Sequence, residues 1–303
     1  MGLLDKARAR ANADRPDDWV KTLMLVDYSS LLYKGLSVNA ELMCKGMYTG
    51  GLVGLTDQLG TLVREHKPEH MIVCADGNPY YRKTQVFPEY KEDRKKRKQQ
   101  LPDEAFAHTR ILGDAFLEAA GIDVWRAKGW EADDLFALAV EHFAKDYDRI
   151  VIASADDDLY QLFNHKNVYL VKKSGLYGHK RFEADYPDLT PEDWVIFNAI
   201  KGSHNNYKGV KGIGEKKALE VMRDDDLLDK TYEEHKDVID LGLKVCALPL
   251  PLSALEEGIK YPEVPKPRAP QYDELAVRDY LRQHGIRPRP TLGQALTHLA
   301  GFK

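Results

Sequence analysis

The sequence predicts an α/β protein with a mostly parallel sheet flanked by helices, followed by a smaller all-helical part. Two observations predict the sheet. Short apolar runs recur through the first half of the chain and end in an acidic residue, and stretches with apolar residues at helical spacing lie between them. Strands that alternate with helices are typical of a parallel sheet. A third observation, a glycine-rich turn between two helical patterns near residue 210, predicts the helical part.

The expected strands are apolar runs of the length and composition that a buried sheet requires. TLMLVD ends at Asp27, HMIVCAD at Asp76 and RIVIASAD at Asp156, and NVYLVKK and IDVWRA are two further strands. The expected helices cover residues 50–66, 103–120 and 131–145, where apolar residues recur every three or four positions. Parallel strands place their carboxyl ends at one edge of the sheet. The three aspartates are therefore expected to lie together at that edge.

The chain divides into four expected regions. Residues 1–20 are expected to form a helical extension, and residues 21–185 hold the sheet with its helices. Residues 186–247 contain the helical run PEDWVIFNAIKG, the glycine-rich turn and a further helix. Residues 248–303 begin with a proline-rich stretch that predicts an extended connector. They end in a helical pattern that is expected to pack on the core.

The composition excludes several classes of protein. The chain has 303 residues, of which 43% are hydrophobic, enough to form a large core. No apolar run approaches the roughly 20 residues of a membrane span, and the three widely spaced cysteines give neither a disulfide framework nor a zinc site. We therefore expect a cytoplasmic protein with no membrane partner. Although the net charge is only -4, basic and acidic residues cluster in separate parts of the sequence. This separation suggests a metal site close to a bound polyanion.

Seven carboxylates fall at the ends of the expected strands or at the start of an expected helix. They are Asp27, Asp76, Glu131, Asp133, Asp134, Asp156 and Asp158. Singly, each could merely cap a helix or close a turn. Together at one sheet edge, they would repel one another strongly unless cations or protons were bound. Oxygen ligands without histidine or cysteine favour Mg²⁺ or Mn²⁺ over zinc, so the cluster predicts a metal site suited to phosphodiester hydrolysis.

Two basic segments are candidates for binding a nucleic acid. Between Arg82 and Lys98, eight basic residues stand against three acidic ones, with aromatic residues interleaved. This segment is either a solvated charged helix or an element that holds a strand by phosphate contacts and base stacking. The turn at residues 209–214 is either a plain helix–helix turn or a loop whose backbone approaches a phosphate. The lysines around it, which would add affinity for any sequence, are Lys208, Lys211, Lys216 and Lys217.

Six short motifs follow one another between about residues 22 and 224: LVD, ADG, PEYK, GWEADD, SADDDLYQLF and GVKGIGEKKA. In this order they resemble the bacterial and bacteriophage 5′ nuclease family, which includes the amino-terminal nuclease domain of bacterial DNA polymerase I and stand-alone flap endonucleases. The resemblance fades after about residue 230. It implies a PIN-like nuclease core, a helical arch at about residues 82–104 and a helix-hairpin-helix in the helical part.

The resemblance also implies roles for single residues. The seven carboxylates match the family's metal-binding acids. Lys91 matches the arch lysine that contacts the scissile phosphate, and Arg82 and Arg94 fall at other basic positions of the arch. Lys91, Arg82 and the metal-binding Asp27 are therefore the expected catalytic residues. The segment that matches the duplex-holding hairpin, often through K⁺, is Gly209, Val210, Lys211, Gly212, Ile213 and Gly214.

Two departures from the family pattern concern the metal sites. Family members commonly carry Gly-Asp-x-x-Asp-Asn before the hairpin, whereas this chain has GSHNN, with Ser203 and Asn205 in place of the aspartates. The lost charges and the shorter loop predict a weakened second metal site. The other departure is Asp157, which stands between the paired acids where glycine or lysine is usual and adds negative charge.

The expected function is a structure-dependent 5′-to-3′ exonuclease and flap endonuclease that hydrolyses DNA by divalent-metal catalysis and leaves 5′-phosphate products. The alternative is a catalytically impaired DNA-junction binding protein. The expected substrates are flap, nicked or 5′-ended duplex DNA, with an RNA–DNA hybrid as a further substrate. Any polymerase is expected to act only in trans, and the protein is expected to be a monomer in a bacterial cell or a phage-infected host.

Two other enzyme classes lack their required residues. An aspartate-nucleophile phosphatase would need a second carboxylate two residues after Asp27, where Ser29 stands. A dinucleotide-binding oxidoreductase would need a glycine-rich turn after the first strand, and DYSSLLY contains no glycine.

Overall fold

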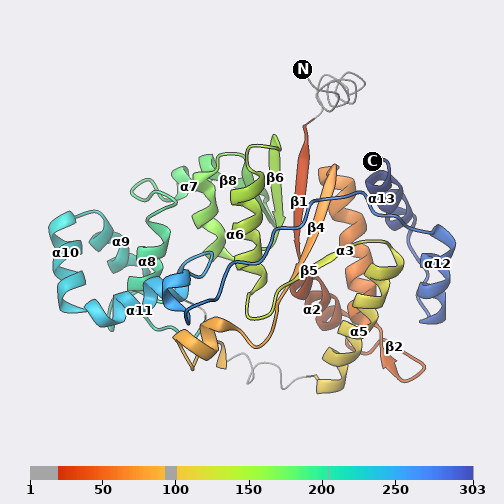
Figure 1. The fold of residues 1–303 in the computed structure, drawn as a ribbon, viewed down its shortest axis with the longest axis horizontal. Helices are drawn as coiled ribbons and strands as arrows, with labels where there is room; N and C mark the ends of the chain where they lie inside the picture. Colours follow the sequence, from red (N-terminus) through yellow and green to blue (C-terminus); the bar gives the residue numbers. More distant parts are fainter. Residues whose placement is uncertain (1–19, 93–100, 204, 303) are drawn as a thin grey trace.

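The computed structural model describes residues 20–92, 101–203 and 205–302. At the centre of this described part lies a six-stranded sheet in the order β5-β4-β1-β6-β7-β8 (Figure 1). Its strands are β1 (Thr22–Asp27), β4 (His70–Ala75), β5 (Val124–Arg126), β6 (Arg149–Ala153), β7 (Val168–Lys172) and β8 (Gly175–Gly178). Neighbouring strands run parallel except β7 and β8, which form an antiparallel edge. The predicted mostly parallel sheet is confirmed.

The register of the three central strands brings their carboxyl ends to one edge. Asp27 of β1 pairs with Cys74 of β4, and Val26 of β1 pairs with Ala153 of β6. β1 is apolar on both faces because helices cover both sides of the sheet. The chain enters β1 at the top of Figure 1 and leaves it at the bottom, so the common carboxyl edge faces downward in that view.

Helices on the two faces of the sheet form two separate apolar cores. One face packs against α2 (Tyr28–Val38), α3 (Gly50–His66), α5 (Asp103–Ala119) and α13 (Pro290–Ala300). The other packs against α6 (Ala132–Phe143), the 3₁₀ helix η3 (Asp157–Asn164) and α7 (His179–Asp185). Met24 and Val26 belong to the first core, and Leu23 and Leu25 to the second. Successive side chains of a strand point to opposite faces, which accounts for this division.

A group of four helices, here called the hairpin lobe, lies on the side of the sheet that carries β8 (Figure 1). Its helices are α8 (Trp194–Lys201), α9 (Glu215–Met222), α10 (Asp225–Glu234) and α11 (Lys236–Cys246). The Tyr207 hydroxyl lies 2.7 Å from both Ala199 O of α8 and Val238 O of α11. This buried tyrosine therefore joins the first and last helices of the lobe.

After the lobe, the chain crosses the molecule in an extended segment, drawn in blue in Figure 1, to reach α12 (Glu274–Gln283) and α13. A short 3₁₀ helix, η4 (Leu252–Ala254), interrupts the segment near its start. Arg268 binds the Asp123 carboxylate through two hydrogen bonds of 2.5 and 2.7 Å. At Gly60 of α3, an added Cβ would lie 3.1 Å from Leu292 N, so α13 packs directly on the backbone of α3.

Several local features differ from the sequence-based expectation. β6 ends at Ala153, so the prediction of a strand reaching Asp156 is wrong; Asp156 instead caps η3. α2 was not predicted, and it starts at once after β1 because Asp27 caps it, accepting from Ser30 N at 2.8 Å. The small hairpin of β2 (Met43–Cys44) and β3 (Met47–Tyr48) was also not predicted.

Two expected segments fall partly or wholly outside the described residues. Residues 1–19, where a helical extension was expected, are not described, and neither are residues 93–100 of the expected arch. The described start of the arch region is a short π-helical turn, η1 (Arg82–Val86). None of the helices in the described ranges combines the length and the apolar character that a membrane crossing requires.

Candidate active site

Three acids predicted to lie together follow the three central strands. Asp27 ends β1, Asp76 follows β4, and Asp156 follows β6 after a turn. Asp76 is oriented by its neighbours: it accepts from Ser29 Oγ at 3.2 Å and from Ala132 N, at the start of α6, at 3.0 Å. The sheet edge and the amino terminus of α6 therefore meet at Asp76.

The amino terminus of α6 carries the EADD acids. Glu131 is the N-cap and Asp134 the third helical residue, and their side chains form a capping box. Both are buried, at 2% and 0% exposure. Asp133, between them, is only half-buried. Burial and the nearby charge of Asp156 raise its pKa well above the usual value, against the charge of Lys91 and with a smaller contribution from Asp27. Within one helical turn, Glu131 and Asp134 face the protein interior and Asp133 faces the acids of the sheet edge.

Burial and mutual repulsion perturb several of these carboxyl groups. Burial, together with the charges of Asp76 and Asp156, raises the pKa of Asp27 to about 6, against the hydrogen bond from Ser30. Burial and the neighbouring Asp156 raise the pKa of Asp158 to about 7. A carboxyl group with a raised pKa holds its negative charge at a cost. A cation between Asp27, Asp133, Asp156 and Asp158 would reduce that cost.

The chemical type of the ligand atoms suits a hard divalent cation. They are carboxylate oxygens, which Mg²⁺ and Mn²⁺ prefer. Within residues 20–92, 101–203 and 205–302, however, no three side chains of aspartate, glutamate, histidine or cysteine stand close enough together to hold an ion as they are placed. The acids are thus close enough to raise one another's pKa, but their oxygens are not yet arranged to coordinate an ion.

Asp134 has a different environment from the one predicted for a metal ligand. Its Oδ2 accepts from Arg82 Nη1 at 2.7 Å and from Glu131 N at 3.0 Å, and its Oδ1 accepts from Leu250 N at 2.8 Å. Both oxygens are therefore occupied by protein donors. In this arrangement Asp134 organises α6 and its neighbours.

Arg82, expected to contact DNA, is buried at 2% exposure. Its guanidinium donates to Asp134 and to Glu131 Oε2 at 3.2 Å, and also to Val245 O at 3.0 Å and Ala247 O at 2.6 Å. A side chain so enclosed does not reach a phosphate on the surface. The expectation of a direct phosphate contact by Arg82 is therefore not met in this conformation.

Lys91 lies inside the site, with its side chain 10% exposed. Its ammonium donates to Glu131 Oε1 and lies 5.3 and 5.0 Å from the ring centres of Tyr80 and Tyr90. Burial alone would raise the pKa of Glu131, but Lys91 and Arg82 together lower it below the usual value. Lys91 thus lies beside the acids, and its contact with the scissile phosphate stays a prediction. Arg94, the third expected arch cation, lies outside the described residues.

The region of the expected second metal ion contains neutral groups and a lysine. Asn198 of α8 donates to Asp158 Oδ1 at 3.1 Å, and the charge of Lys201 opposes the rise in the pKa of Asp158. Ser203 accepts from Asn205 N at 3.4 Å through Oγ. The unusual Asp157 turns away and pairs with Lys172 at 2.6 Å, so its charge is balanced outside the cluster.

The glycine-rich turn joins α8 to α9 as the sequence predicted. Gly209 and Gly212 have φ values of +67° and +84°, a region that favours glycine. Val210 is buried, and its N–H donates to Ile200 O at 2.8 Å, while Gly212 and Gly214 are exposed at the tip. The lysines that surround the tip, Lys208, Lys211, Lys216 and Lys217, are exposed, and Ile213 is half-buried.

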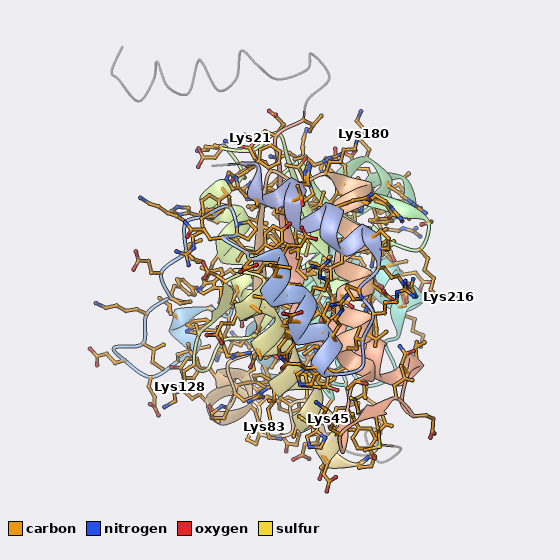
Figure 2. All side chains as sticks on the ribbon, turned by 90° about the vertical axis from the view of Figure 1, so that its right-hand side faces the viewer. Lys21, Lys45, Lys83, Lys128, Lys180 and Lys216 are labelled. Carbon is orange, nitrogen blue, oxygen red and sulfur yellow. The ribbon has the colours of Figure 1, made fainter. Side chains whose placement is uncertain are left out.

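Exposed lysines also lie at the end of the molecule to which the carboxyl edge points. Figure 2 shows Lys45, in the turn between β2 and β3, and Lys83 of η1 at the lower end, and Lys21 and Lys180 at the opposite end. The lower end is the one at which β1, β4 and β6 terminate. Positive charge is therefore present at the end of the molecule toward which the carboxyl edge points, as well as on the hairpin lobe.

A family model described as the 5′-3′ exonuclease, N-terminal resolvase-like domain matches residues 22–187. The chain belongs to this 5′-3′ exonuclease family. The 5′-3′ exonuclease of Bacillus subtilis is 31% identical over 222 residues, which cover 70% of this chain and 73% of the relative. Bacillus subtilis DNA polymerase I is 30% identical over 231 residues, or 74% of this chain and 26% of the polymerase. This chain thus spans about a quarter of the DNA polymerase I chains it matches.

Solved structures share the fold of this 5′-3′ exonuclease family member. A zinc-bound T5 5′-exonuclease superposes with a TM-score of 0.63 at 18% identity, covering 93% of this chain and 99% of that one. Flap endonuclease-1 from Methanococcus jannaschii has a TM-score of 0.60 at 17% identity, with 92% of each chain covered. At these identities the likeness establishes the fold, and the expected nuclease-type architecture is confirmed.

Two residues of the site, Asn198 and Gln161, were not singled out from the sequence, and Tyr90 was expected only as one of the interleaved aromatic residues of the basic segment. Tyr90 hydrogen-bonds Glu131, Asn198 holds Asp158, and Gln161 binds backbone groups beside the cluster. Tyr90 stands in the PEYK motif and Gln161 in SADDDLYQLF, so the motifs contained a signal for both. Asn198 lies in an apolar helix, where a single buried amide without a charged neighbour in sequence gives little indication of its partner.

Proposed function

We propose that this 5′-3′ exonuclease family member is a structure-dependent 5′-to-3′ exonuclease and flap endonuclease that hydrolyses DNA and leaves 5′-phosphate products. The proposal rests on the meeting of half-buried, mutually repelling carboxylates with Lys91 at the carboxyl edge of a family-typical sheet. Relatives named as 5′-3′ exonuclease, and a DNA-bound T5 flap endonuclease of the same fold, support it.

The mechanism assigns different roles to the acids. Asp27, Asp76, Asp133, Asp156 and Asp158 would hold Mg²⁺ or Mn²⁺, which when bound would polarise the phosphate and make a bound water more acidic. Glu131 would hold Lys91 until a substrate phosphate competes for the ammonium. Lys91 would then neutralise charge that develops on the phosphate in the transition state. Arg82 and Asp134 would keep the start of α6 in place throughout.

We propose that the second metal ion is held weakly. Asp158 has an amide, Asn198, and a cation, Lys201, as its neighbours on α8. Neutral Ser203 and Asn205 follow in the turn where the family commonly has aspartates. Fewer negative ligands lower the affinity for a divalent cation, so this ion would be recruited mainly with the substrate phosphate.

The hairpin lobe is proposed to hold duplex DNA without reading its sequence. Gly212 and Gly214 expose backbone groups at the tip, and an added Cβ would meet no atom within 4 Å there. Such a surface can approach a phosphate directly or through K⁺, and the surrounding lysines would add salt-dependent affinity. An RNA–DNA hybrid would satisfy the same backbone contacts and is a further proposed substrate. We also propose that the protein acts as a monomer, with any polymerase in trans.

The test is cleavage of a 5′-labelled flap duplex and a nicked duplex over a range of Mg²⁺ and Mn²⁺ concentrations. Wild type is compared with Asp133→Ala, which removes an acid of the cluster, and with Asp157→Ala, a matched control whose exposed carboxylate pairs with Lys172. We expect metal-dependent cleavage near the junction by wild type and Asp157→Ala, and a loss of at least about 100-fold in Asp133→Ala. Tight flap binding without cleavage by wild type would support the junction-binding protein instead.

A further inference from the structure

The segment from Val245 to Leu250, here called the clamped segment, links the hairpin lobe to the acidic cluster. It includes the last two residues of α11 and the four that follow. Its backbone groups bind side chains from three other elements: η1, η3 and α6. Each of these elements belongs to a part of the chain that carries an acid or a cation of the candidate active site.

Arg82 of η1 satisfies carbonyls at the end of α11. The last carbonyls of a helix have no partner within the helix. Arg82 donates to Val245 O and Ala247 O at 3.0 and 2.6 Å, while its Nη1 binds Asp134 and Glu131. The guanidinium is therefore a direct bridge between the lobe and two carboxylates of the EADD motif.

Gln161 of η3 binds Cys246 and Leu248 through the two ends of its side-chain amide. Its Nε2 donates to Cys246 O at 2.9 Å, and its Oε1 accepts from Leu248 N at 3.1 Å. The same Nε2 donates to Asp158 O at 2.8 Å, which lies in its own helix. Gln161 is buried at 7% exposure. It thus connects the clamped segment with the turn of chain that presents Asp158.

Asp134 makes the third attachment, through Leu250 N at 2.8 Å. Arg82, Gln161 and Asp134 thus bind five backbone groups of the clamped segment, and the Tyr261 hydroxyl donates to a sixth, Leu250 O, at 3.2 Å. Buried polar groups left without partners are costly. The lobe consequently cannot shift relative to the acids without breaking several buried hydrogen bonds.

We propose that Gln161, with Arg82 and Asp134, is a positioning residue that sets the distance between the duplex-holding lobe and the acidic cluster, and thereby selects the phosphodiester bond that is cut. The inference rests on the proposed nuclease function and extends it to the choice of cleavage position. A duplex gripped by the hairpin lobe is presented to the acids at a separation fixed by the clamped segment. Loosening the clamp should spread the cleavage over neighbouring bonds.

The test replaces Gln161 with methionine, which keeps the length of the side chain and removes its hydrogen bonds. Gln58→Met is the matched control: Gln58 Nε2 also donates to two carbonyls, Leu31 O and Gly54 O at 3.0 Å each, but does not contact the clamped segment. Gln161→Asn, which retains a shorter amide, is the milder second variant if Gln161→Met folds poorly. Product lengths, kcat, KM and flap affinity are measured well below the unfolding temperature of each variant.

We expect Gln161→Met to cut over several adjacent bonds with a kcat lowered about 10-fold, while its KM and flap affinity stay within twofold of wild type and Gln58→Met behaves as wild type. Cleavage at the wild-type bond with wild-type kcat would overturn the inference, as would equal scatter of the cleavage positions in Gln58→Met.

If wild type cuts no DNA, the proposed function fails, and hydrogen exchange then tests whether Gln161 holds the clamped segment in place. Faster exchange over residues 245–250 in Gln161→Met, relative to Gln58→Met, supports the clamp, and unchanged exchange overturns it.

Discussion

At the scale of single residues, adjacent carboxylates in α6 have opposite environments. Asp134 receives three hydrogen bonds from Arg82, Glu131 N and Leu250 N. Asp133 is opposed by burial and by the charges of Asp156 and Asp27. In the same motif, Asp134 therefore stabilises the fold, whereas the negative charge of Asp133 is not stabilised by the protein alone.

Exchanging each of these acids for asparagine should have contrasting effects on stability. Asp134→Asn leaves the buried Arg82 without its main partner and turns an amide toward donors, so we expect a loss of about 3–5 kcal/mol in the free energy of unfolding. Asp133→Asn removes a poorly solvated charge and should leave the metal-free stability unchanged or higher. Urea unfolding in chelator measures both. A larger loss for Asp133→Asn would contradict this assignment of roles.

Lys91 provides a second prediction at this scale. Lys91→Met removes the ammonium beside Glu131, and we expect flap cleavage to fall about 100-fold while flap affinity changes little. Lys83→Met is the control, because Lys83 is also in the basic segment but pairs at the surface with Glu92 at 3.5 Å. Single-turnover rates measure the effect. Equal rate losses in the two variants would mean that positive charge in the segment, rather than Lys91, matters.

At the scale of elements, the order of strands and helices could be predicted because each carries its own local pattern. β1, β4 and β6 are continuous apolar runs, and α3 matches its predicted bounds at residues 50–66. The end of β6 was missed because Ser154 and Ala155 continue the small-residue run beyond Ala153. The chain turns into η3 there, and Asp156 caps that helix by accepting from Asp158 N, a capping contact that the apolar pattern does not indicate.

The hairpin glycines offer a test at the element scale. Both Gly209 and Gly212 have positive φ, but an added Cβ at Gly209 would lie 2.3 Å from Gly202 N, whereas one at Gly212 would meet nothing within 4 Å. Gly209→Ala should therefore lower the free energy of unfolding by more than Gly212→Ala, for which we expect about 1 kcal/mol of backbone strain. Thermal unfolding of both variants measures this. Equal losses would show that the hairpin relaxes around Gly209.

At the scale of the whole molecule, the site depends on contacts between residues far apart in the sequence. The acids could be predicted because they follow apolar strands or start a helix, but the partners of Arg82 lie in α6 and after α11. A basic run is normally solvated, so the sequence predicts an exposed Arg82, and its burial becomes visible only when these segments meet. Local patterns contain no such information.

The C-terminal helices give a prediction at this scale. Leu292 of α13 is 2% exposed in the core over α3, and Leu292→Ala should reduce the free energy of unfolding by about 2–5 kcal/mol. Arg268→Ala removes an ion pair whose side chains are 72% and 61% exposed, and should cost less than about 1 kcal/mol. Denaturant unfolding compares the two. A negligible effect of Leu292→Ala would mean that α13 is not part of the folded core.

If the acids at the carboxyl edge bind the catalytic cations, calorimetric titration with Mn²⁺ must detect that binding in the absence of DNA. We expect wild type and Asp157→Ala to bind one ion firmly and a second far more weakly, and Asp133→Asn to lose the firm site. Absence of binding by wild type, or equal binding by Asp133→Asn, would contradict the claim. Two comparably tight sites in wild type would contradict the weakened second site.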